Sequence, residues 1–151
     1  MISSHLNVYK SLNSHKVRYL VIGGLAVNLY GLPRSTKDMD VFIEHDIENC
    51  NKLLTALKEI NFGTAYLTDS KKVMENEITI FDDKMRIDVL TEVKGLEFYS
   101  SWQHRNEVEV ESVIIPFVSF DHLIQSKKAV GRKQDLEDIK YLLKIKQSPT
   151  K

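Results

Sequence analysis

The amino-acid sequence predicts a mixed α/β domain of the α+β class, in which helices back a small, twisted, mixed sheet and two further helices close the chain. Three observations support this expectation. Strand-like and helix-like segments alternate near the start, extended segments that resemble hairpins fill the middle, and two amphipathic patterns follow one another at the end. Segments in this order form a sheet with helices packed against it around one core.

The segments expected to form strands are short, apolar and rich in β-branched residues. One of them, residues 38–44, is apolar on both faces except at its aspartates, which is typical of a strand covered on both sides. We expect a turn at Asp82–Asp83, between two of these segments. The expected strands are residues 17–24, 38–44, 64–68, 77–81, 85–92 and 107–119.

The segments expected to form helices repeat apolar residues every three or four positions. Asp46 and Ser119 are expected to cap two of these helices, and Gly131 is expected to end one. The expected helices are residues 3–15, 24–31, 46–63, 119–131 and 133–146. The residues expected to face the core from the last helix are Leu136, Ile139, Leu142 and Leu143.

The composition agrees with one folded domain. The chain has 151 residues, of which 42% are hydrophobic and 28% are charged, so it holds enough apolar material for a core. We expect a single domain over residues 1–146 and a frayed tail over residues 147–151. The lone cysteine, Cys50, permits no intrachain disulfide and is expected to be a buried structural thiol.

The charge balance and the apolar runs limit the classes of partner. Lys+Arg and Asp+Glu both number 21, so the chain lacks the excess positive charge of many nucleic-acid-binding proteins, although a local basic face is not excluded. The sequence shows no signal-peptide pattern and no apolar run of membrane-spanning length. We therefore expect a cytoplasmic protein without membrane contact.

Three aspartates stand in apolar, strand-like segments, where an unpaired carboxylate is costly. Asp38 and Asp40 are two residues apart and point to the same face of a strand, and Asp88 lies in a later strand. If the strands that carry Asp40 and Asp88 are adjacent, the three carboxylates converge. Such a group of oxygens suits Mg²⁺, and two ions can hold the attacking and leaving oxygens of a phosphoryl transfer.

Each carboxylate also has a structural alternative. Asp38 can pair with Lys37 or Arg34, and Asp88 can pair with Arg86, which stands on the same face of its strand. A second feature favours a metal-binding role of the aspartates over these ion pairs. Gly23-Gly24 lies between an apolar strand and a short helix, where backbone amides can receive a phosphate group.

The stretch from residue 23 to residue 43, GGLAVNLYGLPRSTKDMDVFI, resembles the signature of the nucleotidyltransferase superfamily that includes DNA polymerase beta. Gly23, Gly24, Asp38, Asp40 and Asp88 match this signature in order. The resemblance implies the nucleotidyltransferase fold, an NTP as donor substrate, and Mg²⁺ or Mn²⁺ as cofactor. It also implies that the glycine amides hold the phosphates, that the three aspartates are catalytic metal ligands, and that Asp88 orients or deprotonates the acceptor hydroxyl.

Parts of the chain also resemble small bacterial and archaeal members of the superfamily, among them aminoglycoside nucleotidyltransferase-like proteins and the nucleotidyltransferases of toxin–antitoxin pairs. The likeness rests on GLPRSTKDMD and on KKAVGRKQDLEDIKYL near the end, so it extends from about residue 17 to residue 143. Lys127 and Arg132 in the second stretch are expected to bring positive charge to the nucleotide, and Asp135 is expected to cap the last helix or pair with Arg132.

Two residues before the first aspartate have open roles. Arg34 can bind a phosphate or clamp the carboxylates, and Thr36 can orient Asp38 by a hydrogen bond. Tyr99 and Trp102 can stack on a base, although core packing is the stronger expectation.

The sequence thus favours a metal-dependent transfer of an NMP from an NTP to a hydroxyl of a small molecule, a tRNA or a protein. Because little of the chain is left for acceptor binding, a homodimer or a partner protein can be required. The alternative is a non-catalytic member of the fold that binds a nucleotide or a partner, as in a toxin–antitoxin pair.

Overall fold

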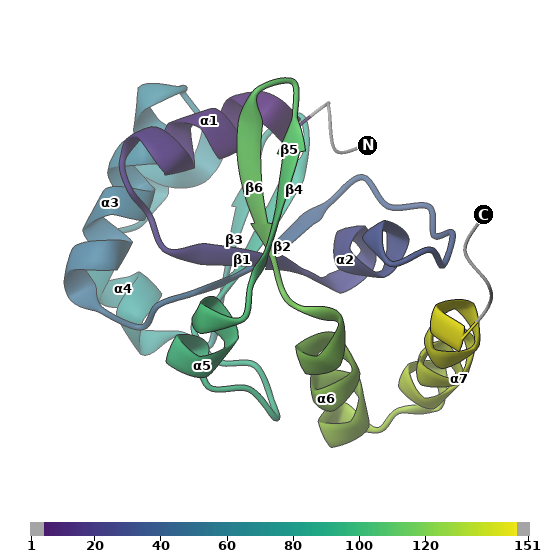
Figure 1. Ribbon diagram of the computed structural model, residues 1–151. Helices are drawn as coiled ribbons and strands as arrows, with labels where there is room; N and C mark the ends of the chain where they lie inside the picture. Colours follow the sequence, from purple (N-terminus) through teal and green to yellow (C-terminus); the bar gives the residue numbers. More distant parts are fainter. Residues whose placement is uncertain (1–4, 148–151) are drawn as a thin grey trace.

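The computed structural model describes residues 5–147 of the chain (Figure 1). The strands are β1 (Tyr19–Ile22), β2 (Met39–Ile43), β3 (Ile78–Asp82), β4 (Arg86–Leu90), β5 (Asn106–Val110) and β6 (Val113–Phe117). The helices are α1 (Leu6–Ser14), α2 (Gly23–Leu29), α3 (Ile47–Glu59), the 3-10 helix η2 (Gly63–Leu67), α4 (Ser70–Glu75), α5 (Phe98–Gln103), α6 (Phe120–Val130) and α7 (Lys133–Gln147). Of the expected frayed tail, Gln147 is the last residue of α7, and the rest lies outside the described residues.

All six strands form one mixed sheet in the order β3-β4-β2-β1-β6-β5. The central strands β1 and β2 are antiparallel, whereas β4 lies parallel to β2 and β6 lies parallel to β1. Two antiparallel hairpins, β3–β4 and β5–β6, form the edges. The predicted α+β class with a mixed sheet is therefore confirmed, and the turn expected at Asp82–Asp83 lies at residues 83–85, directly after β3.

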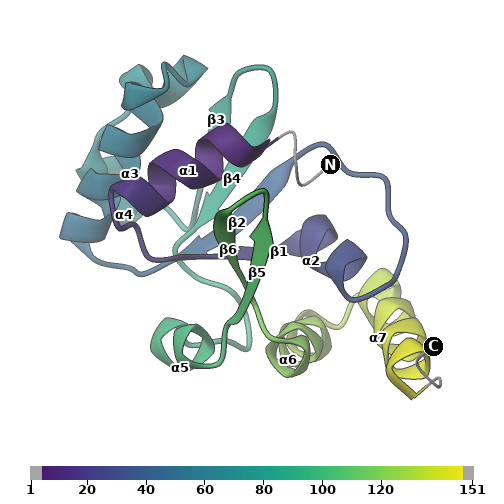
Figure 2. The same cartoon turned by 45° about the horizontal axis from the view of Figure 1, so that its top comes forward.

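The helices divide between the two sides of the sheet, as Figures 1 and 2 show: α1, α3 and α4 gather on one side, while α5 and α6 lie on the other. The side with α1 and α3 holds the main core, because strand residues such as Val21, Val41 and Val89 point to it and are fully buried. Alternate residues of the same strands point to the other face. There Phe42 packs edge-on against Phe98 of α5, with ring centroids 5.2 Å apart.

One local expectation was wrong, and two short helices were missed. Residues 64–68 form no strand but lie largely in η2, because Tyr66 and Leu67 are 61% and 76% exposed and offer no buried face to a sheet. The short helices α4 and α5 were not predicted. Each begins at an acidic residue whose side chain accepts hydrogen bonds from the first turn, Asp69 for α4 and Glu97 for α5.

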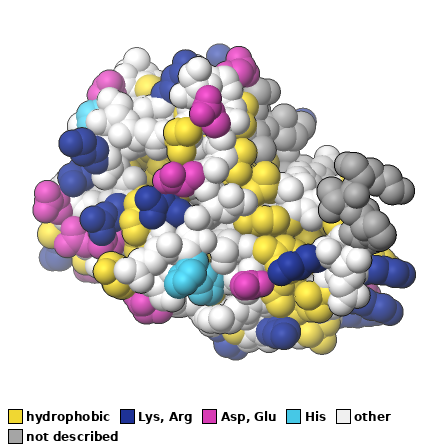
Figure 3. Space-filling model, viewed as in Figure 1, with side chains coloured by type: hydrophobic (Ala, Val, Ile, Leu, Met, Phe, Trp, Pro, Cys, Tyr) yellow, Lys and Arg dark blue, Asp and Glu magenta, His cyan; other side chains and the backbone are white. Residues whose placement is uncertain are grey.

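The last helix also buries fewer residues than its pattern indicates. Ile139 and Leu142 lie in the core, whereas Leu136 and Leu143 are 54% and 39% exposed. Hydrophobic and basic side chains accordingly share the surface over α6 and α7 in Figure 3. Cys50 is a buried free thiol in α3, as expected. Within residues 5–147, no helix combines the length and the hydropathy that a membrane span needs.

Candidate active site

Asp40 of β2 and Asp88 of β4 lie side by side. The two strands are parallel neighbours, and their register places Asp40 directly opposite Asp88. Adjacent strands are about 4.8 Å apart, and paired residues point to the same face, so the two carboxylates share one patch of the sheet. The expectation that these two strands are adjacent is confirmed.

The carboxyl group of Asp40 has a pKa raised from 3.8 to about 6. Burial is the main cause, and the neighbouring carboxylates of Asp88 and Asp38 add to it, while the guanidinium of Arg86 acts in the opposite direction. Two half-buried carboxylates this close disfavour one another's charge. A cation between them would relieve this repulsion.

Asp88 already has one partner. This partner is Arg86, with which the sequence analysis expected Asp88 to pair if it binds no metal ion. Arg86 Nη2 donates a hydrogen bond of 3.0 Å to Asp88 Oδ2. Arg86 Nε lies 2.9 Å from Oδ1. The angle of this second approach does not make a hydrogen bond, and Oδ1 is buried without one. Because the Arg86 side chain is 47% exposed, its guanidinium can exchange Asp88 for water.

Gly23 brings the turn between β1 and α2 against the same carboxylate. Its φ of +67° is in the left-handed region, and a Cβ added there would lie 2.1 Å from Asp40 Oδ2. Only glycine fits this position, on grounds of both backbone conformation and space. The N-cap of α2 is Ile22, which has no side-chain acceptor, so no capping group covers the amides of the first turn.

Asp38 and Thr36 lie on the segment that leads into β2. Thr36 donates to the backbone oxygen of Asp38 at 3.3 Å, so it orders the chain there and not the carboxylate itself. His5, for which no role was predicted, is a buried residue whose Nε2 lies 3.0 Å from the carbonyl oxygen of Lys37. This contact joins positions 32 residues apart, and no spacing pattern in the sequence signals it.

The three aspartates do not form a closed ligand cluster. Across residues 5–147, no group of three or more His, Cys, Asp or Glu side chains is arranged to hold a metal ion. The structure therefore brings Asp40 and Asp88 together, with Asp38 near enough to affect the pKa of Asp40.

Arg34 and Lys127 converge on Asp138 of α7. The two Nη atoms of Arg34 donate to the Asp138 carboxylate at 2.9 and 2.7 Å, and Lys127 Nζ donates at 2.9 Å. The Asp138 side chain is 1% exposed. Burial raises the pKa of Asp138, but hydrogen bonds from Arg34, Lys127 and Gln134 outweigh it and hold the pKa well below its usual range.

Arg132 pairs with Asp135, as the sequence indicated. Its backbone N–H and its Nε donate to Asp135 Oδ2 at 3.2 and 2.9 Å, which caps the start of α7. Lys127 Nζ lies 3.6 Å from Asp135 Oδ1 and links the two pairs. In the part of the chain that the structure describes, the side-chain hydrogen bonds of Arg34 and Lys127 and the Nε bond of Arg132 go to aspartates of α7, and none goes to Asp40 or Asp88.

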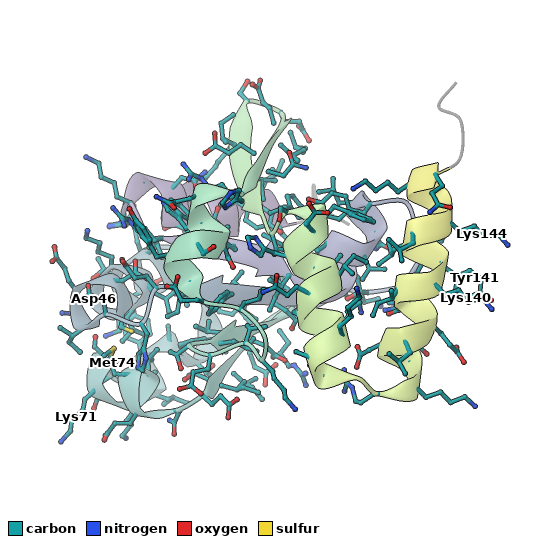
Figure 4. The ribbon with its side chains drawn as sticks, turned by 60° about the horizontal axis from the view of Figure 1, so that its bottom comes forward. Asp46, Lys71, Met74, Lys140, Tyr141 and Lys144 are labelled. Atoms are coloured by element: carbon teal, nitrogen blue, oxygen red, sulfur yellow. The ribbon has the colours of Figure 1, made fainter. Side chains whose placement is uncertain are left out.

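The contacts of α7 define its two faces. Asp135 and Asp138 turn toward α6 and the segment before β2, while Lys140, Tyr141 and Lys144 point away from the rest of the molecule in Figure 4. The aspartates of α7 therefore anchor the helix, and they also hold the segment that carries Arg34 next to it.

Comparisons with known proteins agree with this geometry. A model of the family described as "Nucleotidyl transferase of unknown function (DUF2204)" matches residues 2–150. No curated protein matches the sequence. The fold resembles the crystal structure of a putative nucleotidyltransferase from Thermotoga maritima, with a TM-score of 0.63 over 95% of this chain and 92% of that chain, at 18% identity. Since the family match covers nearly the whole chain, the protein belongs to this family of nucleotidyl transferases.

Proposed function

We propose that the protein transfers a nucleoside monophosphate from an NTP to an acceptor hydroxyl, with Mg²⁺ or Mn²⁺ as cofactor. The observation that carries the proposal is the contact of three backbone elements at one point. Asp40 and Asp88 pair in register, and Gly23 packs directly against the Asp40 carboxylate. A phosphate on the amides of the glycine turn would thus lie beside the two carboxylates.

The residues present fit a divalent cation. Asp40 and Asp88 offer hard oxygen ligands, and Asp88 Oδ1 is buried without a hydrogen bond. Burial raises the pKa of Asp40, and the neighbouring carboxylates add to the shift. We propose these two residues as the principal ligands and Asp38 as the third. When bound, the cation would neutralise the charge of the carboxylates and of the triphosphate.

The chain's own groups have separate tasks in this proposal. The amides of Gly23 and Gly24 bind phosphate oxygens of the NTP. Asp88, released from Arg86, orients the acceptor hydroxyl and accepts its proton. The hydroxyl oxygen forms a bond to the α-phosphorus as the bond to the β-phosphate oxygen breaks, and pyrophosphate leaves. Positioning and charge stabilisation supply most of the rate in transfers of this type.

Arg34, Lys127 and Arg132 enter the proposal as nucleotide-binding residues that must first exchange partners. Each is bonded to an aspartate of α7, so a phosphate oxygen has to replace a carboxylate oxygen. Thr36 supports the site through the backbone of Asp38. The acceptor in this proposal is a small molecule, a tRNA or a protein, bound with the help of a second copy or a partner protein.

The test is a transfer assay with α-labelled NTPs, Mg²⁺ or Mn²⁺, and separate pools of small molecules, tRNA and protein. Wild type should transfer label in a metal-dependent manner, and Asp88→Asn should lower the rate at least about a hundredfold. Asp121→Asn is the matched control, because the Asp121 side chain is 88% exposed on α6. Metal-dependent stabilisation by NTP, followed by thermal unfolding, gives a second readout that does not need the acceptor.

A second candidate is a non-catalytic nucleotide-binding member of the fold. The ion pair between Arg86 and Asp88 favours it, because this pair neutralises the proposed base. In that case NTP and metal would raise the melting temperature of the wild type, but no pool would receive label. If NTP and metal leave the melting temperature unchanged, both candidates are wrong.

A further inference from the structure

A cavity of about 670 Å³ opens far from the glycine turn, at the other end of β1. Its walls come from the end of α1, the start of β1, the β5–β6 hairpin and the end of α5. Tyr19, at the start of β1, lines the cavity, whereas Ile22, at its end, pairs with Asp40. These two residues are about 10 Å apart along the strand, so the cavity is separate from the carboxylate pair.

The cavity is strongly basic in a chain of zero net charge. Lys10, Lys16, Arg18 and Arg105 line it, and Glu107 is the lone acidic residue of its lining, so its formal charge is four minus one, or +3. Arg18 pairs with Glu44 outside the lining at 3.5 Å, and Arg105 pairs with Glu107, whereas within residues 5–147 neither lysine forms an ion pair that would neutralise it. A concave wall with an excess of positive charge concentrates anions.

One wall also carries a flat, fixed cation. The Arg105 guanidinium lies 4.0 Å from the ring centroid of Trp102, and the Trp102 ring also stacks on Phe98. Arg105 Nε donates to Glu107 at 3.0 Å, and Nη1 donates to the Trp102 carbonyl at 2.8 Å. The guanidinium is thus held as a plane, and a nucleic-acid base can stack on such a plane.

Lys16 occupies a position where helices normally place glycine. It follows the C-cap of α1 with φ of 57°, and its N–H bonds to Asn13 O while that of Val17 bonds to Leu12 O. This pattern ends a helix through a left-handed residue, which is usually glycine because other side chains are strained there. This strained position places the Lys16 side chain at the rim of the basic cavity.

We propose that this cavity binds a phosphorylated nucleotide unit, with phosphates on Lys10, Lys16 and Arg18 and the base stacked on Arg105. The unit belongs either to a single-stranded polynucleotide or to a free nucleotide, which share this chemistry. The inference goes beyond the proposed function, because binding here requires neither transfer nor the carboxylate pair.

Trp102 is the chain's only tryptophan, so its fluorescence reports on this cavity directly. The probes are a short single-stranded RNA, ATP, AMP and inorganic pyrophosphate, titrated without metal into the full chain. The RNA or the nucleotides should change the fluorescence in a saturable manner. Tighter binding of RNA identifies a polynucleotide as the source, and equal or tighter binding of ATP or AMP identifies a free nucleotide.

Two variants separate this proposal from a general attraction of anions. Lys16→Gly should weaken binding at least about fivefold and, for RNA, reduce the slope of log K against log salt by about 0.7. The same variant should raise the melting temperature, because it relieves the left-handed strain. Arg105→Lys keeps the charge and removes the plane, so it should weaken ATP binding more than pyrophosphate binding. Lys71→Gln, on the exposed surface of α4, is the matched control.

Specific outcomes would overturn the proposal. An unchanged fluorescence with every probe, confirmed by unchanged anisotropy of a labelled RNA, excludes the site. If pyrophosphate binds as tightly as ATP, and Arg105→Lys weakens the binding of both equally, the cavity is a simple anion site without base recognition. If Lys16→Gly binds the probes as tightly as the wild type does, the phosphates do not bind at Lys16. None of these results bears on transfer at Asp40 and Asp88, which the labelled assay tests separately.

Discussion

The replacement Asp138→Asn removes the charge at the centre of the contact between α7 and the segment before β2. The side chain keeps its size, but Arg34 and Lys127 lose the carboxylate that they share. Asp138 is 1% exposed, Lys127 is 12% exposed and Arg34 is 30% exposed. The change therefore leaves the partly solvated guanidinium of Arg34 without an anion, and it leaves the largely buried ammonium of Lys127 with only the longer contact to Asp135, at 3.6 Å.

Loss of one member of a buried ion pair costs about 3–5 kcal/mol, because the remaining charge stays desolvated. The exposure of Arg34 favours the lower end of this range, since its guanidinium can turn to water. In a chain of this size each kcal/mol lowers the melting temperature by about 2–4 °C, so we expect a loss of about 6–12 °C for a cost of about 3 kcal/mol. Urea unfolding at neutral pH measures the free energy directly.

The pH dependence gives an independent check with a definite sign. Because the pKa of folded Asp138 lies below its unfolded value, the carboxylate stabilises the fold above about pH 4, and this contribution is lost as the pH falls. The difference between wild type and Asp138→Asn should therefore shrink in acid. A destabilisation below about 1 kcal/mol at neutral pH, or one that does not depend on pH, would refute the buried ion-pair network.

Three further changes test the site and the fold. Asp40→Asn should stabilise the metal-free protein by about 1–3 kcal/mol at pH 8 and by almost nothing below pH 4. The reason is that the raised pKa of about 6 makes ionised Asp40 weaken the fold as the pH rises. An equal effect of the replacement at both pH values contradicts this. Gly23→Ala should cost more than about 2 kcal/mol in chemical unfolding, since its Cβ meets Asp40 and its φ is positive; a neutral result would show that the turn differs. Replacement of Glu111 and Ser112 by Asn and Gly should raise stability by about 1–2 kcal/mol in the same assay, because both have positive φ in the β5–β6 turn; no gain would contradict a strained turn.

Most of the fold was predictable because its signals are local. The alternation of apolar residues, the caps at Asp46 and Ser119, and the stop at Gly131 each act within a few residues, and the structure confirms all three termini. The segment at 64–68 was harder, because its composition suits a strand while its side chains have no sheet face to cover. Helices as short as α4 and α5 show too few turns for an apolar period to be visible.

The candidate site also has a part that local sequence signals predict and a part that they do not. Asp40, Asp88 and the glycine turn could be placed together from the sequence, since strand periodicity and a glycine after a strand are local features whose pairing needs only one assumption about neighbouring strands. The partner of Arg34 could not be placed. Its nearest acidic residue in sequence is Asp38, but its hydrogen bonds reach Asp138, 104 residues away.

That long-range contact changes the meaning of the cations near the site. The sequence predicts that Lys127 and Arg132 bring positive charge to the nucleotide, and that Arg34 either binds a phosphate or clamps the carboxylates. In the structure they are bonded to carboxylates of α7, so a nucleotide that recruits Arg34 or Lys127 must compete with Asp138. The same bonds hold α7 to the segment that enters β2 at Asp38. Nucleotide contact with Arg34 or Lys127 and the docking of α7 would then be coupled, because both use the cations that donate to the buried Asp138 carboxylate.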